Sequence, residues 1–370
     1  MHILLDARAA TNPQSDLARY CRGVTEGLIP LLAPDEHLTV IFARHADLPN
    51  VSREHCRLRR AHHNLNTLAG QHEIARIVRR ARPDIVWSPT PKFLPPAGNA
   101  AIVIVTHDRP YGRERSFRAL FRINTFRRIL LNRRLRRAHA IICPTHALAQ
   151  ALAAGDANPI VQKIHVIPDG HSSAFRPATG GQIEALRRTY CLPPRYLLAT
   201  LNPDDPHAID ILLDAISRSK ETDLQPLVIL AAPQDTRRLE SIIRDRRLEG
   251  RVRAETLKRA EDLRPFLSAA TLLLEPAYSP TFPSTILYTM ACGTPVIAAA
   301  TPAHIELGAN AIFRVHPTDP VEWKKAIIQA ILSPVWQERF KKEGLERAAR
   351  FTWRDTAEQT LALLRTLPKP

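Results

Sequence analysis

Arginine is the residue type whose spacing points most directly to chemistry, namely the binding of an anionic surface or polymer. Eleven arginines and one acid, Glu114, lie between Arg109 and Arg137. Residues 1–170 hold 25 Lys and Arg against 13 Asp and Glu, so most of the net charge of +16 belongs to the first half. The use of 43 Arg against 9 Lys is typical of an arginine-favouring genome, but it does not explain this uneven placement. The electrostatic field of so many clustered positive charges attracts anions at physiological salt.

Residues 116–137 combine this charge with a helical pattern. The apolar positions are Phe117, Leu120, Phe121, Ile129, Leu130 and Leu135, and the basic ones are Arg118, Arg122, Arg127, Arg128, Arg133, Arg134, Arg136 and Arg137. Three interpretations remain open: a core helix with a solvated basic face, contact with an anionic membrane surface, or a protein or nucleic-acid partner. Nucleic acid is disfavoured because no nucleic-acid fold signature accompanies the charge.

Cysteine usage and the apolar runs indicate the compartment. The cysteines are five in number and lie far apart, at Cys21, Cys56, Cys143, Cys191 and Cys292. This predicts reduced thiols, without a disulfide framework, a zinc site or another cofactor. Met1–Asp6 reaches a carboxylate before any apolar core of useful length, which predicts no secretion signal, and no run approaches the roughly 18 apolar residues of a membrane span. We expect a cytoplasmic protein, free or peripheral at the inner face of the plasma membrane.

The elements that must position any site follow an α/β rhythm, in which short apolar runs alternate with helical patterns. The expected strands are His2–Leu5, Leu38–Phe42, Ile85–Trp87, Ala101–Val105, Ala140–Cys143, His165–Ile167, Tyr196–Thr200, Leu227–Leu230, Val252–Ala254, Thr271–Leu274, Pro295–Ala298 and Ile312–Val315. The expected helices are Leu17–Leu32, His72–Arg80, Ser116–Arg137, Ile209–Arg218, Thr236–Asp245, Ala260–Ser268, Thr285–Ala291, Pro320–Leu332 and Arg354–Leu367. The pattern predicts parallel sheets with crossover helices.

A chain of 370 residues is long enough for two domains of this kind. The Gly-rich stretch Pro177–Gly181 marks the junction. We therefore expect a first domain over 1–176, a second over 177–352, and a final helix within 353–370 that crosses back to the first domain. Two doubly wound domains in series would bind ligands between the carboxyl ends of their strands.

Several segments together resemble motifs of the family 4 glycosyltransferases, which are retaining nucleotide-sugar enzymes of the GT-B fold with two Rossmann-like domains. In chain order these are Leu4–Arg8 with Leu17–Tyr20 (the opening strand and "G-I-G-R-Y"), Thr106–Asp108 ("H-D"), His165–Gly170 ("V-I-P-N-G"), Thr289–Ala298 ("A-M-A-C-G-T-P-V-I-A"), Ile305–Glu306 ("P-E") and Phe351–Trp353 ("F-S-W"). The resemblance covers nearly the whole chain and implies a GT-B fold.

In the first domain the resemblance implies a role for few residues. The two glycines of "G-I-G-R-Y", which let a backbone approach donor phosphates or acceptor, correspond to Asp16 and Ala18, while Arg19 and Tyr20 persist. His107 corresponds to the family's histidine near the sugar-transfer centre and is the candidate catalytic residue. It can equally be a histidine that caps a strand end.

In the second domain the positions of the donor contacts are substituted. The family's Arg and Lys, which hold the diphosphate, correspond to Pro206 and His207, in a turn that contains two carboxylates. The family's two glutamates, of which one contacts the donor sugar and the other the ribose, correspond to Pro280 and Tyr288. Of the residues between them only Phe282 keeps its identity.

Three functions therefore stay open, of which a basic nucleic-acid or polyanion binder is the least favoured. The first is a pseudo-glycosyltransferase of cell-surface glycan assembly that supports a partner glycosyltransferase or binds glycan. The second is an active retaining hexosyltransferase that moves a sugar from a nucleotide sugar to a glycan or lipid-linked acceptor through altered donor contacts. The joint replacement of cations, glutamates and glycines favours the first.

Overall fold

The computed structural model describes residues 1–12, 15–46, 49, 54–65, 67–107, 130–154, 159–201, 205–220, 224–278 and 281–368. The chain forms two compact units. The first comprises Met1–Gly170, Pro280–Phe282 and Phe351–Pro370, and the second comprises His171–Ser279 and Pro283–Arg350. The sequence placed this boundary at 176/177. It lies at Gly170 because the next residues join the second unit, where His171 Nε2 lies 3.2 Å from the Ala348 carbonyl oxygen.

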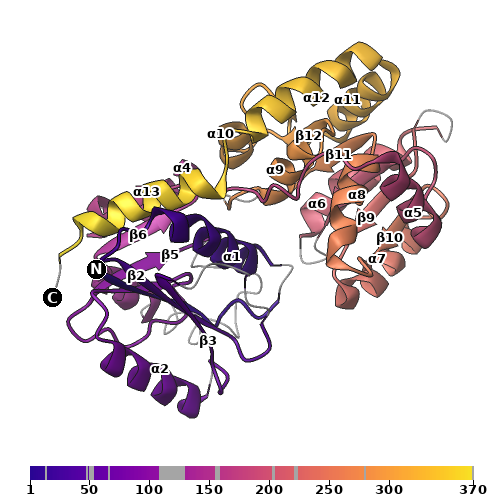
Figure 1. Cartoon of the computed structure of the whole chain (residues 1–370). Helices are drawn as coiled ribbons and strands as arrows, with labels where there is room; N and C mark the ends of the chain where they lie inside the picture. The colour runs from indigo at the N-terminus through magenta and orange to yellow at the C-terminus, as the bar shows by residue number, and fades with distance from the viewer. Residues whose placement is uncertain are drawn as a thin grey trace, which may run out of the picture. The chain divides into compact units, whose positions relative to one another are not determined.

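The first unit is built on a parallel seven-stranded sheet in the order β3-β2-β1-β4-β5-β6-β7 (Figure 1). Its strands are β1 (His2–Ala7), β2 (His37–Phe42), β3 (Cys56–Arg60), β4 (Ile85–Ser88), β5 (Ala101–Val105), β6 (Ala140–Cys143) and β7 (Ile164–Val166). The order reverses between β1 and β4, where doubly wound sheets bind ligands.

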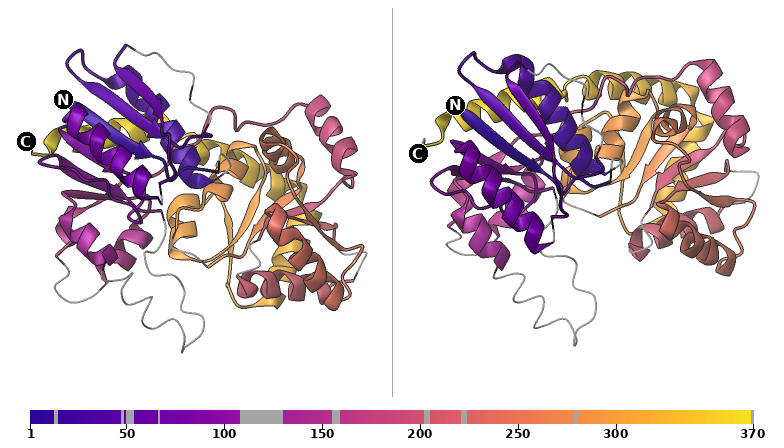
Figure 2. Two further views of the ribbon diagram at one scale, coloured as in Figure 1. Left: turned by 90° about the horizontal axis from the view of Figure 1, so that it is seen from below. Right: turned by 60° about the horizontal axis from the view of Figure 1, so that its bottom comes forward.

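Helices cover both faces of this sheet. They are α1 (Asp16–Leu28) with the 3-10 turn Ile29–Leu31, α2 (Leu68–Ala81), a helical segment over 130–137, α4 (His146–Ala153) and α13 (Trp353–Thr366), with a second 3-10 turn at Val161–Lys163. Although α13 ends the chain, Ala357, Leu361 and Leu364 on it are buried in the first core. Helix α13 lies beside α1 in Figure 1, and both views of Figure 2 show it packed with the first unit.

The second unit holds a parallel six-stranded sheet in the order β10-β9-β8-β11-β12-β13. Its strands are β8 (Leu197–Thr200), β9 (Leu227–Leu230), β10 (Val252–Glu255), β11 (Leu272–Glu275), β12 (Val296–Ala299) and β13 (Phe313–Val315). Its helices are α5 (Gly180–Tyr190), α6 (Pro206–Ser217), α7 (Pro233–Asp245), a 3-10 turn (Ala260–Asp262) leading into α8 (Leu263–Ala269), α9 (Ser284–Ala291), α10 (Pro302–Gly308), α11 (Pro320–Leu332) and α12 (Pro334–Ala348). Here the order reverses between β8 and β11.

The expected α/β class is confirmed, and every expected strand is present within one or two residues of its bounds. Strand β3 was not expected, because its sequence Cys-Arg-Leu-Arg-Arg has too few apolar residues to stand out. The glycines expected to form a linker instead open α5, where Thr179 and Gln182 make a capping box.

The structure describes only part of the arginine-rich segment, residues 116–137. Residues 116–129 lie outside the described residues, whereas 130–137 are helical, as expected, with Leu135 buried. Arg134 is half-buried and donates hydrogen bonds to the carbonyl oxygens of Pro91 and Lys92, so it does not belong to a freely solvated face. Within the parts of the chain that the structure describes, no helix combines the length and apolarity needed to cross a bilayer.

Candidate functional site

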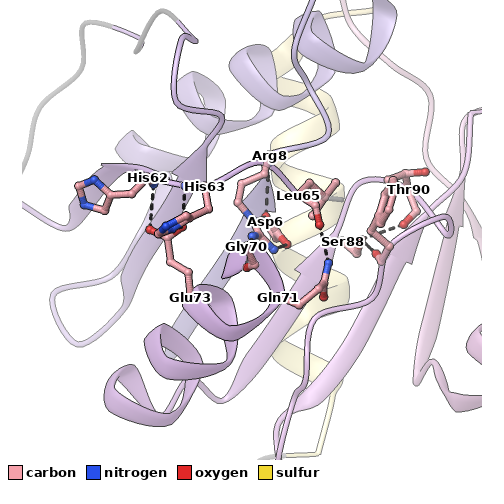
Figure 3. Close-up of polar contacts among 11 residues, drawn as sticks. Asp6, Arg8, His62, His63, Leu65, Gly70, Gln71, Glu73, Ser88 and Thr90 are labelled. Atoms are coloured by element: carbon pink, nitrogen blue, oxygen red, sulfur yellow. Dashed lines mark hydrogen bonds and ion pairs between the residues drawn. The ribbon is translucent and has the colours of Figure 1, made fainter. Parts of the chain in front are cut away.

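The carboxyl edge of the first sheet begins with a buried ion pair after β1. The Arg8 guanidinium binds both carboxylate oxygens of Asp6, at 2.7 and 2.9 Å, and donates a third hydrogen bond to the Gly70 carbonyl oxygen at 2.8 Å (Figure 3). Asp6 and Arg8 are 4% and 2% exposed. The two charges neutralise each other, so Arg8 is not available as a cation for a ligand. The hydrogen bond from Arg8 to Gly70 connects the end of β1 to α2.

Two further contacts organise the loops at this edge. Glu73 accepts hydrogen bonds from the backbone N–H groups of His62 and His63, at 2.9 and 3.0 Å (Figure 3). Burial opposes the charged form, but these hydrogen bonds lower the pKa of Glu73 below its ordinary value. Ser88, at the end of β4, donates to the carbonyl oxygens of Thr90 and Phe93. Glu73 therefore helps to fix the loop that contains His62 and His63.

The first turn of α1 carries the substituted glycine positions. Ser15 caps the helix by accepting a hydrogen bond from the Ala18 N–H at 3.2 Å. Asp16 and Arg19 form an ion pair at 3.1 Å on the exposed side of this turn. Asp16, Ala18 and Arg19 therefore form an ordinary capped helix start.

His107 follows β5 and faces a carboxylate that the sequence had not linked to it. Its Nε2 lies 3.1 Å from Oδ2 of Asp169, which follows β7, and the two side chains are 13% and 8% exposed. The ring of Tyr20 packs edge-on against the imidazole, with 4.7 Å between ring centres. His107 is thus held between a carboxylate and an aromatic ring at the carboxyl edge of the sheet.

In the second unit the switch point lies at the start of α6. Asp205 caps this helix, and its Oδ1 accepts a hydrogen bond from the Ala208 N–H at 3.3 Å. Pro206 occupies the first helical turn and has no N–H to offer. The Nε2 of His207 lies 3.1 Å from the carbonyl oxygen of Pro317, which ties this ring to the loop after β13.

A second carboxyl group lies nearby. Glu275 ends β11, the strand that pairs with β8, and is 7% exposed. Its Oε1 accepts a hydrogen bond from the Ala277 N–H at 3.2 Å. Burial raises the pKa of Glu275 to about 7, and the carboxylate of Asp205 adds to that rise. The switch point of this unit is therefore lined by two acids.

Tyr288 lies on α9 and is buried in an aromatic stack. Its ring is parallel to that of Phe175, with 4.3 Å between ring centres and 4° between planes. Phe282 lies just before α9, whereas Pro280 lies outside the described residues. Tyr288 thus contributes packing at a position where the family resemblance implied a carboxylate.

The structure brings together only some of the expected site residues. Pro206 and His207 share the start of α6, and Asp16, Ala18 and Arg19 share the start of α1. Sequence reasoning missed Asp169 as a neighbour of His107, and it assigned no role to Glu275. The available signal was position, since each acid follows or ends a strand at the carboxyl edge of its sheet.

Metal-ligand and thiol chemistry find little support in the described ranges. Within them, no group of three or more His, Cys, Asp or Glu side chains is arranged to hold a metal ion. Cys21, Cys56, Cys143 and Cys292 are buried free thiols, and Cys191 is an exposed one. Burial raises the pKa of Cys56 and Cys292 to about 11, which leaves both thiols protonated and unreactive at neutral pH.

Comparison with protein families identifies both units. The model described as Glycosyltransferase Family 4 matches residues 25–174, and the model described as Glycosyl transferases group 1 matches residues 196–333. Each unit thus matches a glycosyltransferase model over most of its sheet.

Individual relatives agree with this result. A D-inositol 3-phosphate glycosyltransferase of Stackebrandtia nassauensis is 27% identical over 215 residues, or 54% of this chain and 48% of the relative. The matched regions span between about a quarter and a half of such curated relatives. Sucrose-phosphate synthase of Thermosynechococcus elongatus has a TM-score of 0.76 at 19% identity, covering 99% of this chain and 98% of that one. Anabaena HepE in complex with UDP-glucose has a TM-score of 0.74 at 19% identity, with coverages of 99% and 100%.

Proposed function

Because the chain belongs to the family 4 glycosyltransferases of the GT-B fold, we propose that it acts in cell-surface glycan assembly with impaired or absent donor-sugar transfer. In this role it would bind a glycan or lipid-linked acceptor, or support a partner glycosyltransferase. We place it in the cytoplasm or at the inner face of the plasma membrane.

The observation that carries this proposal is the start of α6. A nucleotide-sugar transferase must hold a diphosphate, and helix N-termini do so with free backbone N–H groups. Here Pro206 lacks the N–H, and the carboxylate of Asp205 occupies the N–H of Ala208. A diphosphate would meet the negative charge of Asp205 in place of a hydrogen-bond donor, and Glu275 would add to the repulsion once ionised.

The remaining donor positions point the same way. His207 is tied to the Pro317 carbonyl oxygen and offers at most one titratable charge where the family resemblance implied permanent cations. Tyr288 is stacked on Phe175, and its hydroxyl cannot provide the two-oxygen acceptor that a ribose or sugar diol requires.

The second candidate function is an active retaining hexosyltransferase with altered donor contacts. The specific observation in its favour is His107, which is retained and paired with Asp169 at 3.1 Å. The UDP-glucose in the HepE complex suggests a UDP-sugar as the donor class for such an activity.

Calorimetric titration of the full chain with UDP, GDP and UDP-glucose tests the proposal. We expect no saturable binding at millimolar nucleotide, because the described residues at the start of α6 offer a diphosphate neither a permanent cation nor an uncapped helix end. Saturable binding at tens of micromolar would favour the active enzyme and contradict the impaired one.

A rescue experiment identifies the cause. The combined variant Pro206→Arg, His207→Lys and Tyr288→Glu restores the two cations and one of the two glutamates that the family resemblance implies, and we expect it to bind UDP measurably. Each single substitution serves as a control and should bind no better than the wild type. Thermal unfolding must accompany the titration because the glutamate at 288 breaks the stack with Phe175. A folded triple variant without any binding would place the defect elsewhere.

A further inference from the structure

The pairing of His107 with Asp169 is specific to the residues of this chain. The segment His165–Gly170 resembles a family motif that has asparagine where this chain has Asp169. An amide at this position would be neutral, whereas the carboxylate of Asp169 brings a negative charge to 3.1 Å from Nε2 of His107. The side chain of Asp169 is only 8% exposed, so water screens this charge weakly.

The backbone behind Asp169 is fixed by the last helix of the chain. A Cβ on the next residue, Gly170, would lie 2.2 Å from the backbone nitrogen of Trp353 and 2.3 Å from the carbonyl carbon of Thr352. The chain therefore presses directly on the start of α13. Trp353 also packs edge-on against Tyr20, with 6.0 Å between ring centres, so both neighbours of His107 are held by α13.

Among the described residues, the titratable groups of α1 and β1 that face the pair are neutral or already paired. Burial raises the pKa values of Tyr20 and Cys21 on α1, so both remain protonated at neutral pH. Asp6, the other acid that interacts electrostatically with Cys21, is bound by Arg8. Asp169 therefore places a negative charge directly beside His107.

We propose that Asp169 is a positioning residue that holds His107 in its protonated, imidazolium form at the carboxyl edge of the first sheet. The carboxylate oxygen lies 3.1 Å from Nε2, where its negative charge favours the protonated ring. The positive charge of a protonated ring there would stabilise a substrate oxygen that gains negative charge. Only this last step rests on the second candidate function, an active transferase, because the contact between the two side chains exists without a substrate.

Long-range proton–nitrogen NMR of the nitrogen-15-labelled full chain tests the pair directly, with His107→Gln to assign the signal. In the wild type, His107 should titrate above the ordinary histidine value of about 6.5. In Asp169→Asn, which keeps the shape and removes the charge, the midpoint should fall by about 1 to 3 pH units. A merely structural role for Asp169 would not move this midpoint.

Glu73→Gln provides the matched control, since Glu73 lies 3.4 Å from Nδ1 of His63 in a more exposed pair. It should leave the titration midpoint of His107 unchanged. An unchanged His107 midpoint in folded Asp169→Asn would overturn the proposal. If that variant does not fold, a wild-type midpoint at or below about 6.5 overturns it and a higher one supports it. These outcomes are independent of nucleotide binding, so failure here is distinguishable from failure of the proposed function.

Discussion

Replacing Glu275 by glutamine should stabilise the second unit, and the gain should grow with pH. Glu275 is 7% exposed, and burial, aided by Asp205, raises its pKa from 4.5 to about 7. Because the folded state then binds the proton more tightly than the unfolded state, this contribution to stability is complete below about pH 4.5 and is lost as the pH rises through 7. At 1.36 kcal/mol per pH unit, the difference amounts to about 3 kcal/mol of unfolding free energy at pH 8.

Differential scanning calorimetry of the full chain at pH 5 and pH 8 measures this effect. Glutamine keeps the side-chain oxygen that accepts the Ala277 N–H, so the comparison isolates the charge. About 2 to 4 °C per kcal/mol is usual for a unit of this size, so the Tm gain of Glu275→Gln at pH 8 should exceed that at pH 5 by about 5 to 10 °C.

Glu240, exposed on α7, gives the control variant Glu240→Gln, which should change stability by no more than about 0.5 kcal/mol at either pH. Equal gains for Glu275→Gln at the two pH values would refute the reasoning, because they would show that the buried carboxyl group titrates normally. A loss at pH 8 would show that its charge is compensated by a partner.

Two further predictions concern the close contact between Gly170 and α13, and the charge of the arginine-rich segment. Gly170→Ala should destabilise the chain by about 1 to 3 kcal/mol in thermal unfolding, because the added Cβ would collide with the α13 backbone. Gly181→Ala is the control: a Cβ there would have nothing within 4 Å, so this variant should be neutral or slightly stabilising. If the arginine-rich segment meets anionic lipid, replacing the exposed Arg133, Arg136 and Arg137 by glutamine should reduce co-sedimentation with anionic vesicles at low salt without lowering Tm. Equal sedimentation of the wild type with neutral vesicles would contradict an electrostatic contact.

The fold was largely predictable because each central strand is a short apolar run, a pattern that survives without tertiary information. Leu227–Leu230 and Ala101–Val105 were predicted to the residue. Strand β3 was not predicted because it lies at the edge of its sheet and exposes arginines. It is recognised only from its parallel pairing with β2, which begins at Leu38 and Cys56. Edge strands need fewer apolar residues, since one side of them stays solvated.

The sites were predictable only as positions. The resemblance located His107 and the start of α6, but no local pattern shows that β5 and β7 bring His107 to Asp169. Arg134 illustrates the same limit, because helical spacing placed it on a polar face while its actual partners are two carbonyl groups far along the chain. Contacts between distant segments depend on the completed sheet order, which periodicity does not encode.

The start of α6 illustrates how fold stability and anion binding compete for the same atoms. An acidic cap such as Asp205 and a proline at the first turn are residues that stabilise a helix start. Both act by satisfying or removing backbone N–H groups, and a diphosphate needs those same groups free. A chain under selection to bind a donor diphosphate must leave the N–H groups at this helix end uncapped. A chain without that selection can cap them with its own side chains. The two-residue sequence Asp205-Pro206, together with the buried acid at Glu275, fits the second condition.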